Sequence, residues 1–411
     1  IDGQYAFDTY YATDSLRATS VGYLPLTRPV KRDAAQTIDF ALETSRAELP
    51  EVVVTYKENS AFAILRQVIR NKNVNNRAKL AAYEYENYNK VEFDLNNITE
   101  EFKKKKLFKD LEFIFEYVDT TTRKPSLPIF MTETVSDVYY RQEPRTRREI
   151  IKGNRVSGVE NESITQFMGD MYQNVNIYEN YLELFGKNFT SPIADGGKAH
   201  YDYLLVDSNW VGRNWCYLIR FKPKHRQQLC FTGEMWINDT SFAVRRIEGG
   251  IEPGTNVNFV QELRVRQEYE EVAREVWMLT RDELLVDLNP VRDTGEVSKR
   301  PLQGFYGRRT ATYRDFVINK PRDDAFYRGM SEVVVETDPL SLGADWWDTH
   351  RHEQLSKREN DIYHMVDTMR TVPRFKTYLD IITTVVSGYY VTGPVEIGPY
   401  FNIFSFNPVE G

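Results

Sequence analysis

The clearest pattern in the chain is a change of hydrophobic period that begins near residue 61. From Ala61 to Ile69 apolar residues recur every three or four positions, which predicts one amphipathic helix that ends in the polar run 71–76. From Ala81 the period becomes two, with aromatic and aliphatic residues at odd positions and mainly charged residues at even positions up to Leu95. This alternation predicts a long strand with one apolar face and one face exposed to water.

A series of alternating segments follows in the second half of the chain. The strands that we expect cover residues 215–221, 229–237, 242–251, 257–269, 276–288 and 305–318. Short polar turns such as Asn238-Asp239 join several of them, and this arrangement favours an antiparallel meander. Between the long strand and this meander we expect loops and helices, with a capping box at Ser163 and Gln166 and a helix over 178–185.

The two ends of the chain differ in pattern from its centre. Residues 1–54 hold short alternating runs that are separated by Asp, Gly and Pro, which predicts part of a β-sandwich. Helical periodicity returns within 345–369, and the last segment alternates loosely. The chain starts with Ile1 and has no signal sequence, so we expect a fragment or a processed chain. We divide it into four parts, 1–54, 56–320, 321–387 (connector and helices) and 388–411.

Composition narrows the class of protein. The 411 residues are 41% hydrophobic, which is enough for cores in two or three domains, and the 26 Tyr and 23 Phe favour β structure. A net charge of −7 argues against a polyanion-binding protein, so we do not expect nucleic acid as a partner. The longest uncharged run, 381–395, is interrupted by glycines and Pro394, so no membrane-spanning helix is predicted.

The sequence contains few candidates for catalytic chemistry. Nucleophile-elbow, dinucleotide-binding and Walker-type glycine motifs are all absent from it. The one metal-like cluster is His350, His352 and Glu353, with His364 further along; a metal-dependent hydrolase is therefore one hypothesis, and a polar helix start with exposed imidazoles is the simpler one. We expect no enzymatic activity and no cofactor.

Two further sets of residues have alternative interpretations. The basic cluster within 141–155 is interpreted as a solvated strand or loop, and a patch for an anionic lipid or a partner is the alternative. Cys216 and Cys230 are interpreted as two separate buried thiols, although neighbouring strands would let them form a disulfide in an oxidising compartment.

Several longer stretches resemble a known family. "IDGQYAFDTYYATDSLRATSVGY" resembles the later strands of the carboxypeptidase-regulatory-like domain found in Bacteroidota outer-membrane proteins. "LPIFMTETVSDVYY", "WCYLIRFKPKHRQQLCFTGEMWINDTSFAVRRI" and "GPVEIGPYFNIFSFNPVEG" resemble the Bacteroidota family of unknown function that follows this domain. The resemblance implies a C-terminal outer-membrane β-barrel whose first strand begins near "NPVEG".

These patterns together lead to one expected fold. We expect a mainly β chain with α+β character: a partial β-sandwich, an antiparallel half-barrel-like sheet with helices, and a helical link into the first strand of the presumed outer-membrane barrel. The order of elements in the middle part is similar to the half-barrel of periplasmic lipoprotein carriers, whose apolar concave face can hold an acyl chain or a partner segment. A plain packed core under a helical lid is the simpler alternative. The candidates for the apolar face are Tyr83, Tyr85, Phe93, Met235, Ile237, Phe259, Val276 and Met278.

Our first hypothesis for function is a non-enzymatic, periplasm-facing part of a Bacteroidota outer-membrane protein that acts as a docking or assembly element. Its expected partners are other outer-membrane or periplasmic proteins, with barrel-assembly and TonB-dependent transport complexes among the candidates. The second hypothesis is a carrier or binding module for lipid or another apolar ligand.

Overall fold

The computed structural model divides the chain into two compact units, Ile1–Glu58 and Asn59–Gly411. It describes residues 5, 14–20, 23–32, 34–43, 59–105, 108–109, 111–158, 171, 175–225, 228–252, 255, 257, 260–289, 304–328, 333–335, 342–370, 390–392 and 395–397. In the first unit, β1 (Ser15–Ala18) and β2 (Leu26–Pro29) form an antiparallel hairpin. The second unit holds every feature discussed below.

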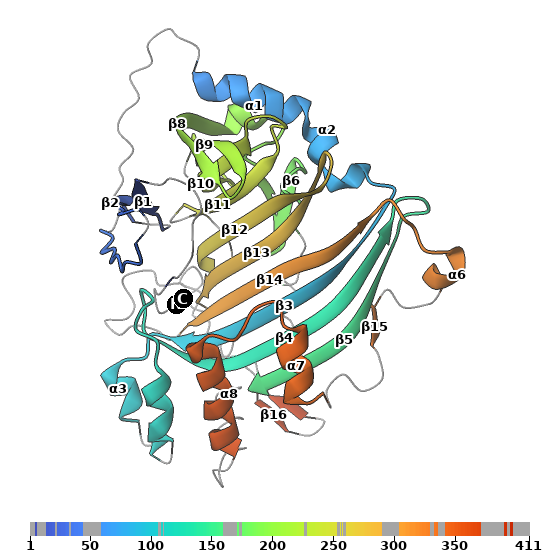
Figure 1. Ribbon diagram of the computed structural model, residues 1–411. Coiled ribbons are helices and arrows are strands. Elements are labelled where there is room, and N and C mark those ends of the chain that lie inside the picture. Colours follow the sequence, from blue (N-terminus) through green and yellow to red (C-terminus); the bar gives the residue numbers. More distant parts are fainter. Residues whose placement is uncertain are drawn as a thin grey trace, which may run out of the picture. The chain divides into compact units, whose positions relative to one another are not determined.

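A sheet of eleven strands, counted over the described residues, forms the body of the second unit (Figure 1). In chain order the strands are β3 (Ala82–Asn96), β4 (Ser126–Arg141), β5 (Thr146–Gly158), β8 (Tyr201–Val211), β9 (Asn214–Pro223), β10 (Phe231–Asn238), β11 (Val244–Ile251), β12 (Val260–Ala273), β13 (Val276–Leu288), β14 (Phe305–Ile318) and β15 (Val333–Val335). Their order in space is β15-β5-β4-β3-β14-β13-β12-β11-β10-β9-β8. Neighbours are antiparallel, apart from β15 and β5, which are parallel. The chain is therefore mainly β, as expected.

The pairing of β14 with β3 joins two consecutive sets of strands into this one sheet. Phe305 lies opposite Leu95 and Ile318 opposite Tyr83, so the pairing runs over almost the whole of both strands. One set is β3 to β5 and the other is the meander from β8 to β14. The long strand predicted from its period of two thus lies inside the sheet, with neighbours on both sides.

Helices and short hairpins complete the second unit. Helix α1 (Ser60–Arg70) is the predicted amphipathic helix; the Asn59 side chain caps it by accepting from the Ala61 N–H, and it buries Ala61, Leu65 and Val68. The other elements are α2 (Lys72–Asn75), η1 (Arg77–Lys79), α3 (Glu100–Lys103), η3 (Glu112–Tyr117), β6 (Tyr181–Leu184), β7 (Lys187–Thr190), α5 (Gly197–His200), α6 (Asp324–Tyr327), α7 (Ala344–His350), α8 (Lys357–Arg370), β16 (Tyr390–Thr392) and β17 (Val395–Ile397). Within the described residues, no helix is both long and apolar enough to cross a membrane.

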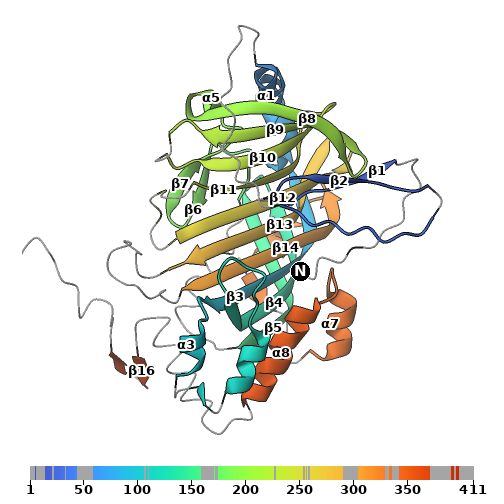
Figure 2. The ribbon, with the colours of Figure 1, turned by 90° about the vertical axis from the view of Figure 1, so that its left-hand side faces the viewer.

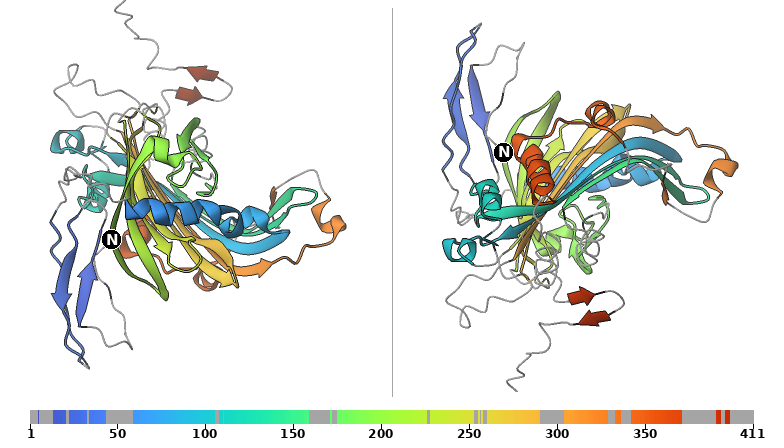
Figure 3. Two further views of the ribbon diagram at one scale, coloured as in Figure 1. Left: turned by 90° about the horizontal axis from the view of Figure 1, so that it is seen from above. Right: turned by 90° about the horizontal axis from the view of Figure 1, so that it is seen from below.

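The two faces of the sheet have different covers. The β6–β7 hairpin lies on one side, and α7 and α8 lie on the opposite side (Figures 2 and 3). We call the side under β6–β7 the inner face; it carries the odd-numbered aromatic residues of β3, such as Phe93. The side under α7 and α8 is the outer face, and it carries the even-numbered residues of β3, such as Glu92. Most of the large buried apolar side chains belong to one cluster that includes Phe93, Phe221 and Leu284.

Three sequence predictions about these elements are wrong. The even-numbered face of β3, expected to be wet, is buried, because arginines and the segment 343–370 cover it. The charged residues Glu84, Glu86, Lys90, Glu92 and Asp94 are each less than a tenth exposed. The expected loop-and-helix region contains β4, whose residues are mostly buried regardless of parity, so that its alternation is weak. The helix expected over 178–185 is replaced by β6, because four residues with alternating burial fit a strand as well as a helix turn. The capping box at 163–166 lies outside the described residues.

Candidate functional site

The cover of the inner face is attached by side-chain hydrogen bonds and by a backbone hydrogen bond at 2.9 Å from the Thr190 N–H to the Leu229 carbonyl, just before β10. Strands β6 and β7 pair with each other and, in the part that the structure describes, with no strand of the main sheet. Tyr178 accepts a hydrogen bond from the Val244 N–H at 3.0 Å. Tyr201 bridges the cover and the sheet, because its hydroxyl donates to the Thr190 carbonyl at 2.5 Å and accepts from the Phe231 N–H at 3.0 Å. The cover can therefore shift without breaking a strand ladder of the main sheet.

An apolar cavity lies between this cover and the inner face. It has a volume of about 40 Å³. Its lining is Met171, Val175, Ile177, Leu182, Leu184, Pro192, Phe221, Phe231, Ile247, Gly249, Val265, Gln267, Asp282, Leu284 and Arg309. Gly249 contributes no side chain to this space, and a Cβ added there would lie 3.5 Å from the Phe221 ring. Twelve of the fifteen lining residues are apolar, so the cavity suits a hydrocarbon group.

The polar side chains of the cavity bond to one another. The Nη1 atom of Arg309 lies 3.0 Å from the Asp282 carboxylate, and the two side chains are only 5% and 4% exposed. The amide of Gln267 donates to Asp282 at 3.3 Å and to the Val175 carbonyl at 3.2 Å. Burial raises the pKa of Asp282, and the charge of Arg309 opposes this rise. The pair therefore presents little net charge to anything that enters the cavity.

The residues predicted for the apolar face lie together in the core but not in the cavity. Tyr83, Tyr85, Phe93, Met235, Ile237, Val276 and Met278 are all buried and belong to the main hydrophobic cluster. None of them lines the cavity, and Phe259 lies outside the described residues. For these seven side chains the packed core is the observed arrangement.

Sequence reasoning missed the residues that do line the cavity. Ile247, Val265 and Leu284 lie within predicted strands, so their alternation was a usable signal. Leu182 and Leu184 come from the hairpin that was predicted as a helix, and no local pattern indicates that it packs against those strands.

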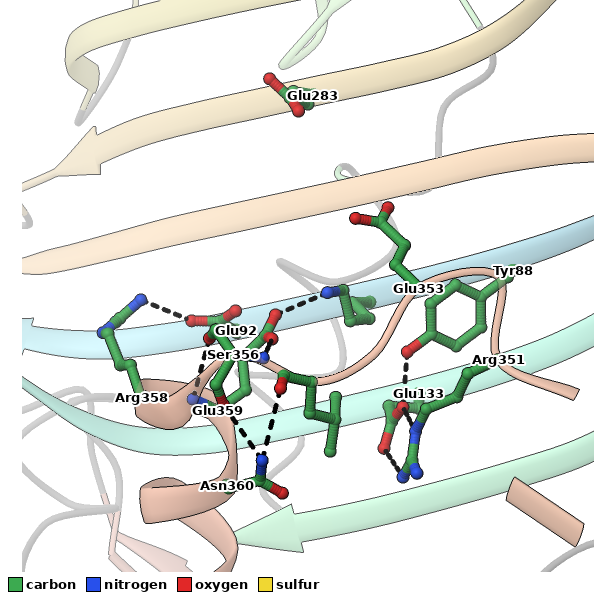
Figure 4. Close-up of polar contacts among 12 residues, drawn as sticks. Tyr88, Glu92, Glu133, Glu283, Arg351, Glu353, Ser356, Arg358, Glu359 and Asn360 are labelled. Carbon is green, nitrogen blue, oxygen red and sulfur yellow. Dashed lines mark hydrogen bonds and ion pairs between the residues drawn. The ribbon is translucent and has the colours of Figure 1, made fainter. Parts of the chain in front are cut away.

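On the outer face, one buried carboxylate receives four hydrogen bonds. Arg351 donates to both oxygens of Glu133, at 2.7 and 2.9 Å, and the Tyr88 hydroxyl donates at 2.6 Å (Figure 4). The Tyr363 hydroxyl is the fourth donor. Burial alone would raise the pKa of Glu133, but the hydrogen bonds from Arg351, Tyr363 and Tyr88 outweigh it and lower the pKa. An ionised Glu133 thus joins β4 to the segment that precedes α8.

Further ion pairs extend this contact along the segment 343–370. Lys90 on β3 lies 2.6 Å from Glu359, whose other oxygen accepts from the Ser356 N–H at 2.6 Å. Arg358 pairs with Glu92 at 3.0 Å (Figure 4) and also with Asp94 at 2.8 Å. We call this set of contacts between the outer face and residues 343–370 the polar clamp.

A glycine makes room for the aromatic part of the same segment. A Cβ added to Gly153 on β5 would lie 2.4 Å from the ring of Trp346, so only a residue without a side chain allows this ring to lie against the strand. Trp347 is buried beside Tyr88 and Val135. The segment is therefore held by packing as well as by charge.

The metal-like cluster does not converge. The His350 ring stacks on Trp346 at a centroid distance of 4.0 Å, and Glu353 pairs with Arg281 at 2.9 Å. His352 lies 3.2 Å from Glu86 through Nε2 and 2.8 Å from the Thr312 hydroxyl through Nδ1. Burial, together with the charge of Arg314, lowers the pKa of His352, which favours the neutral ring in this position. In the described residues, no three His, Cys, Asp or Glu side chains are placed to hold a metal ion.

The basic cluster of β5 is largely occupied within the chain. Lys152 pairs with Glu86 and, at 2.8 Å, with Asp137, while the Arg155 guanidinium lies 3.9 Å from the centroid of the Tyr363 ring. These contacts fit the interpretation as a strand better than that of a lipid patch.

The two cysteines are free and buried. Cys216 lies opposite Asn238 at the end of β10, and Cys230 precedes the start of that strand, so the length of β10 separates the two thiols.

Comparisons with known proteins give one informative match. No curated protein is similar at a significant level. Solved structures with partial similarity include a DUF1329 family protein from Desulfovibrio piger (10% identity, 66% of this chain and 98% of the other, TM-score 0.26). A putative outer membrane lipoprotein-sorting protein domain from Vibrio parahaemolyticus has 7% identity, covering 64% and 95%, with a TM-score of 0.24. A LolA superfamily protein from Nitrosomonas europaea has 9% identity, covering 66% and 99%, with a TM-score of 0.22.

TM-scores this low do not establish a shared fold, so the family assignment rests on sequence. Residues 64–297, more than half of the chain, match the family of unknown function DUF5686. This range runs from α1 to just beyond β13 and includes all the main-sheet strands except β14 and β15. The chain therefore belongs to the DUF5686 family.

Proposed function

We propose that the second unit is a non-enzymatic binding module that holds an apolar ligand, the acyl chain of a lipid, between the inner face and the β6–β7 cover. The observation that carries this proposal is the apolar cavity at that boundary. Pockets for small molecules are mostly apolar and contain a few fixed polar groups, and the set of Gln267, Asp282 and Arg309 fits that description.

The cavity must widen to accept such a ligand. Its 40 Å³ give room for about three water molecules, which is less than a long acyl chain needs. Displacement of the β6–β7 hairpin supplies the space, since no strand ladder of the described main sheet includes the hairpin and its movement breaks side-chain hydrogen bonds, apolar packing and the backbone bond from Thr190 to Leu229. Burial of each methylene group of the ligand contributes about 0.8 kcal/mol, which offsets the packing energy that the hairpin gives up when it moves.

Occupancy is tested directly by native mass spectrometry of the purified protein, and affinity by titration with the apolar fluorescent probe N-phenyl-1-naphthylamine. Val265→Phe places a larger side chain in the cavity, and we expect it to remove co-purified acyl species and to weaken probe binding at least tenfold. Val74→Phe is the matched control, because Val74 is 45% exposed on α2 and does not line the cavity.

Circular dichroism and thermal melts first establish that both variants fold. The proposal fails if the wild-type protein carries no acyl species and binds no probe, or if both variants bind as tightly as the wild type.

The docking role expected from the sequence is a second candidate, and the polar clamp favours it. The outer face binds a segment that contains two helices by means of ion pairs and aromatic packing, and a docking element uses the same interactions. From the sequence resemblance we propose that the protein faces the periplasm at a Bacteroidota outer membrane and docks onto other envelope proteins there. Membrane flotation of the full-length protein, followed by a gentle-detergent pull-down, tests this role; recovery in the soluble fraction without partners would contradict it.

A further inference from the structure

Beside the apolar cavity, the inner face of the sheet carries a row of polar, uncharged side chains. Two of them are Asn87 and Asn89, odd-numbered residues in the middle part of β3. The strand register sets Asn89 opposite Thr134 on β4, and Thr134 opposite Asn154 on β5, so these side chains lie on one face. We call the set the amide band; its members are Asn87, Asn89, Thr132, Thr134, Ser136 and Asn154.

Two amide oxygens of the band lack a hydrogen-bond partner within the part of the chain that the structure describes. They are the Oδ1 atoms of Asn87 and Asn89, and both atoms are buried. Asn89 is 2% exposed, so bulk water does not reach its amide freely. Buried polar groups in folded proteins are nearly always hydrogen-bonded, so a bound molecule that supplies donors would be stabilised here.

The hydroxyl groups next to these amides are already engaged. The Thr132 and Thr134 hydroxyls each donate to Oδ1 of Asn154 at 3.3 Å. The Ser136 hydroxyl donates to the Glu149 carboxylate at 2.8 Å. The donors for the two amide oxygens must therefore come from outside the band.

The band adjoins the cavity on β14. Arg309 lines the cavity, and Ala311, two residues further along the same face, lies directly opposite Asn89. Because diagonal neighbours in an antiparallel pair lie about 7–8 Å apart, the band begins at that distance from Arg309. A ligand with its hydrocarbon chain in the cavity can therefore reach the band with its head group.

We infer that this ligand is a lipid whose head group is uncharged and carries hydroxyls, as in a glycerol or a sugar, and that Asn87 and Asn89 bind those hydroxyls. The inference rests on the proposed function, because it assigns the head group of the lipid whose acyl chain occupies the cavity. A hydroxyl donates to an amide oxygen and also accepts from an amide N–H, so it matches each asparagine in either orientation of the amide.

The charges at the band argue against an anionic head group. All six side chains of the band are uncharged, and Arg309 at its boundary is paired with Asp282 at 3.0 Å. A phosphate or carboxylate on the band would be buried without a counter-charge, which is far more costly than the burial of a hydrogen-bonded hydroxyl.

Three lipids with the same acyl chain test the head group. Monodecanoylglycerol carries free hydroxyls, methyl decanoate carries none, and ionised decanoate carries a charge. Displacement of bound N-phenyl-1-naphthylamine measures the affinity of each. We expect the wild type to prefer monodecanoylglycerol over methyl decanoate by at least about tenfold, since a site that bonds a hydroxyl discriminates against an analogue without one. Decanoate should bind no better than the methyl ester.

Substitution of the amides tests which residues bind the head group. Asn89→Leu keeps the size of the side chain and removes the amide, so it should abolish the preference while methyl decanoate still binds. Asn73→Leu is the matched control, because Asn73 is exposed on α2, and it should keep the full preference. Circular dichroism establishes that the variants fold, and Asn87→Leu supplies the same comparison if Asn89→Leu does not.

The outcomes separate the inference from the proposed function. A wild type that binds monodecanoylglycerol and methyl decanoate equally, or decanoate more tightly than the methyl ester, overturns the inference and leaves the acyl-chain site in place. A preference that survives removal of the amides overturns it as well. A wild type that binds neither the probe nor any of the three lipids contradicts the proposed function, and the inference with it.

Discussion

Arg351 and Glu133 are 218 residues apart in the chain and form a doubly hydrogen-bonded ion pair on the outer face of the sheet. The Glu133 side chain is fully buried and that of Arg351 is 8% exposed. The geometry is bidentate, and two tyrosine hydroxyls occupy remaining acceptor positions of the carboxylate. The pair therefore fixes where the segment before α8 meets β4.

Removal of the Glu133 carboxylate should strongly destabilise the fold. Glu133→Ala removes the buried partner of the Arg351 guanidinium and leaves it with the exposed Asp348, which costs about 3–5 kcal/mol in the free energy of unfolding. Asp348→Ala is the control, since Asp348 also pairs with Arg351, at 3.1 Å, but is 73% exposed; we expect a change within about 0.5 kcal/mol. Urea denaturation measures the free energy of unfolding of both variants. Equal losses of stability in the two variants would contradict the role assigned to burial.

Lys90 and Glu359 should be energetically coupled. Their side chains are 7% and 11% exposed, and their charged atoms lie 2.6 Å apart. Lys90→Met and Glu359→Gln each leave the charge of the other residue without its partner. The double variant removes both charges. We expect the double variant to be less destabilised than the sum of the single variants by about 0.5–3 kcal/mol. A double-mutant cycle by chemical denaturation measures this difference, and strict additivity would argue against the pair.

Acid should remove the stabilisation that Glu86 supplies. Burial would raise the pKa of Glu86, but hydrogen bonds from Lys152 and Arg314 dominate and lower it from 4.5 to about 2. Because the pKa is lower in the folded state than in the unfolded state, the stabilisation is complete above pH 4.5 and is lost as the pH falls towards 2.

The stability difference between the wild type and Glu86→Gln isolates this effect. Burial raises the pKa of Glu92 and of Asp282, so protonation of these two groups in acid favours the folded state. Both groups are present in the wild type and in the variant, so their contribution cancels in the difference. We expect a difference that is large at pH 7 and shrinks between pH 4.5 and 2. Denaturation curves across this range measure it, and a difference that does not change with pH would contradict the prediction.

Gly250 should tolerate no side chain. A Cβ added there would lie 2.4 Å from the Leu263 carbonyl oxygen, on the strand that pairs with β11. Gly250→Ala forces the backbone of β11 and β12 apart, at a cost of about 1–3 kcal/mol. Gly196→Ala is the matched control, because no atom lies within 4 Å of the added Cβ and the φ angle of Gly196 is −90°. Thermal melts should show a clear loss for the first variant and almost none for the second.

Elements with a local pattern could be predicted from the residue order alone. The helix α1 and the strands β3 and β9 to β14 each carry a recognisable period, 3.6 for the helix and 2 for the strands. The polar turn at Asn238 was also recognisable, because an Asn side chain commonly bonds to its own backbone in a turn. In the structure, the Asn238 side chain accepts from the N–H groups of Thr240 and Ser241.

What lies on each face of the sheet depends on the folded chain and could not be predicted in this way. The charged residues of β3 are the same residue types that a wet face would carry, and Glu92 and Lys90 are buried because Arg358 and Glu359 arrive from more than 200 residues later. The cavity likewise needs Leu182 from the hairpin and Leu284 from β13 at one place. Hydrophobic periodicity indicates which side chains of an element are covered. It contains no information about which distant segment covers them. The covering segment is determined by the summed packing and ion pairing of the folded chain.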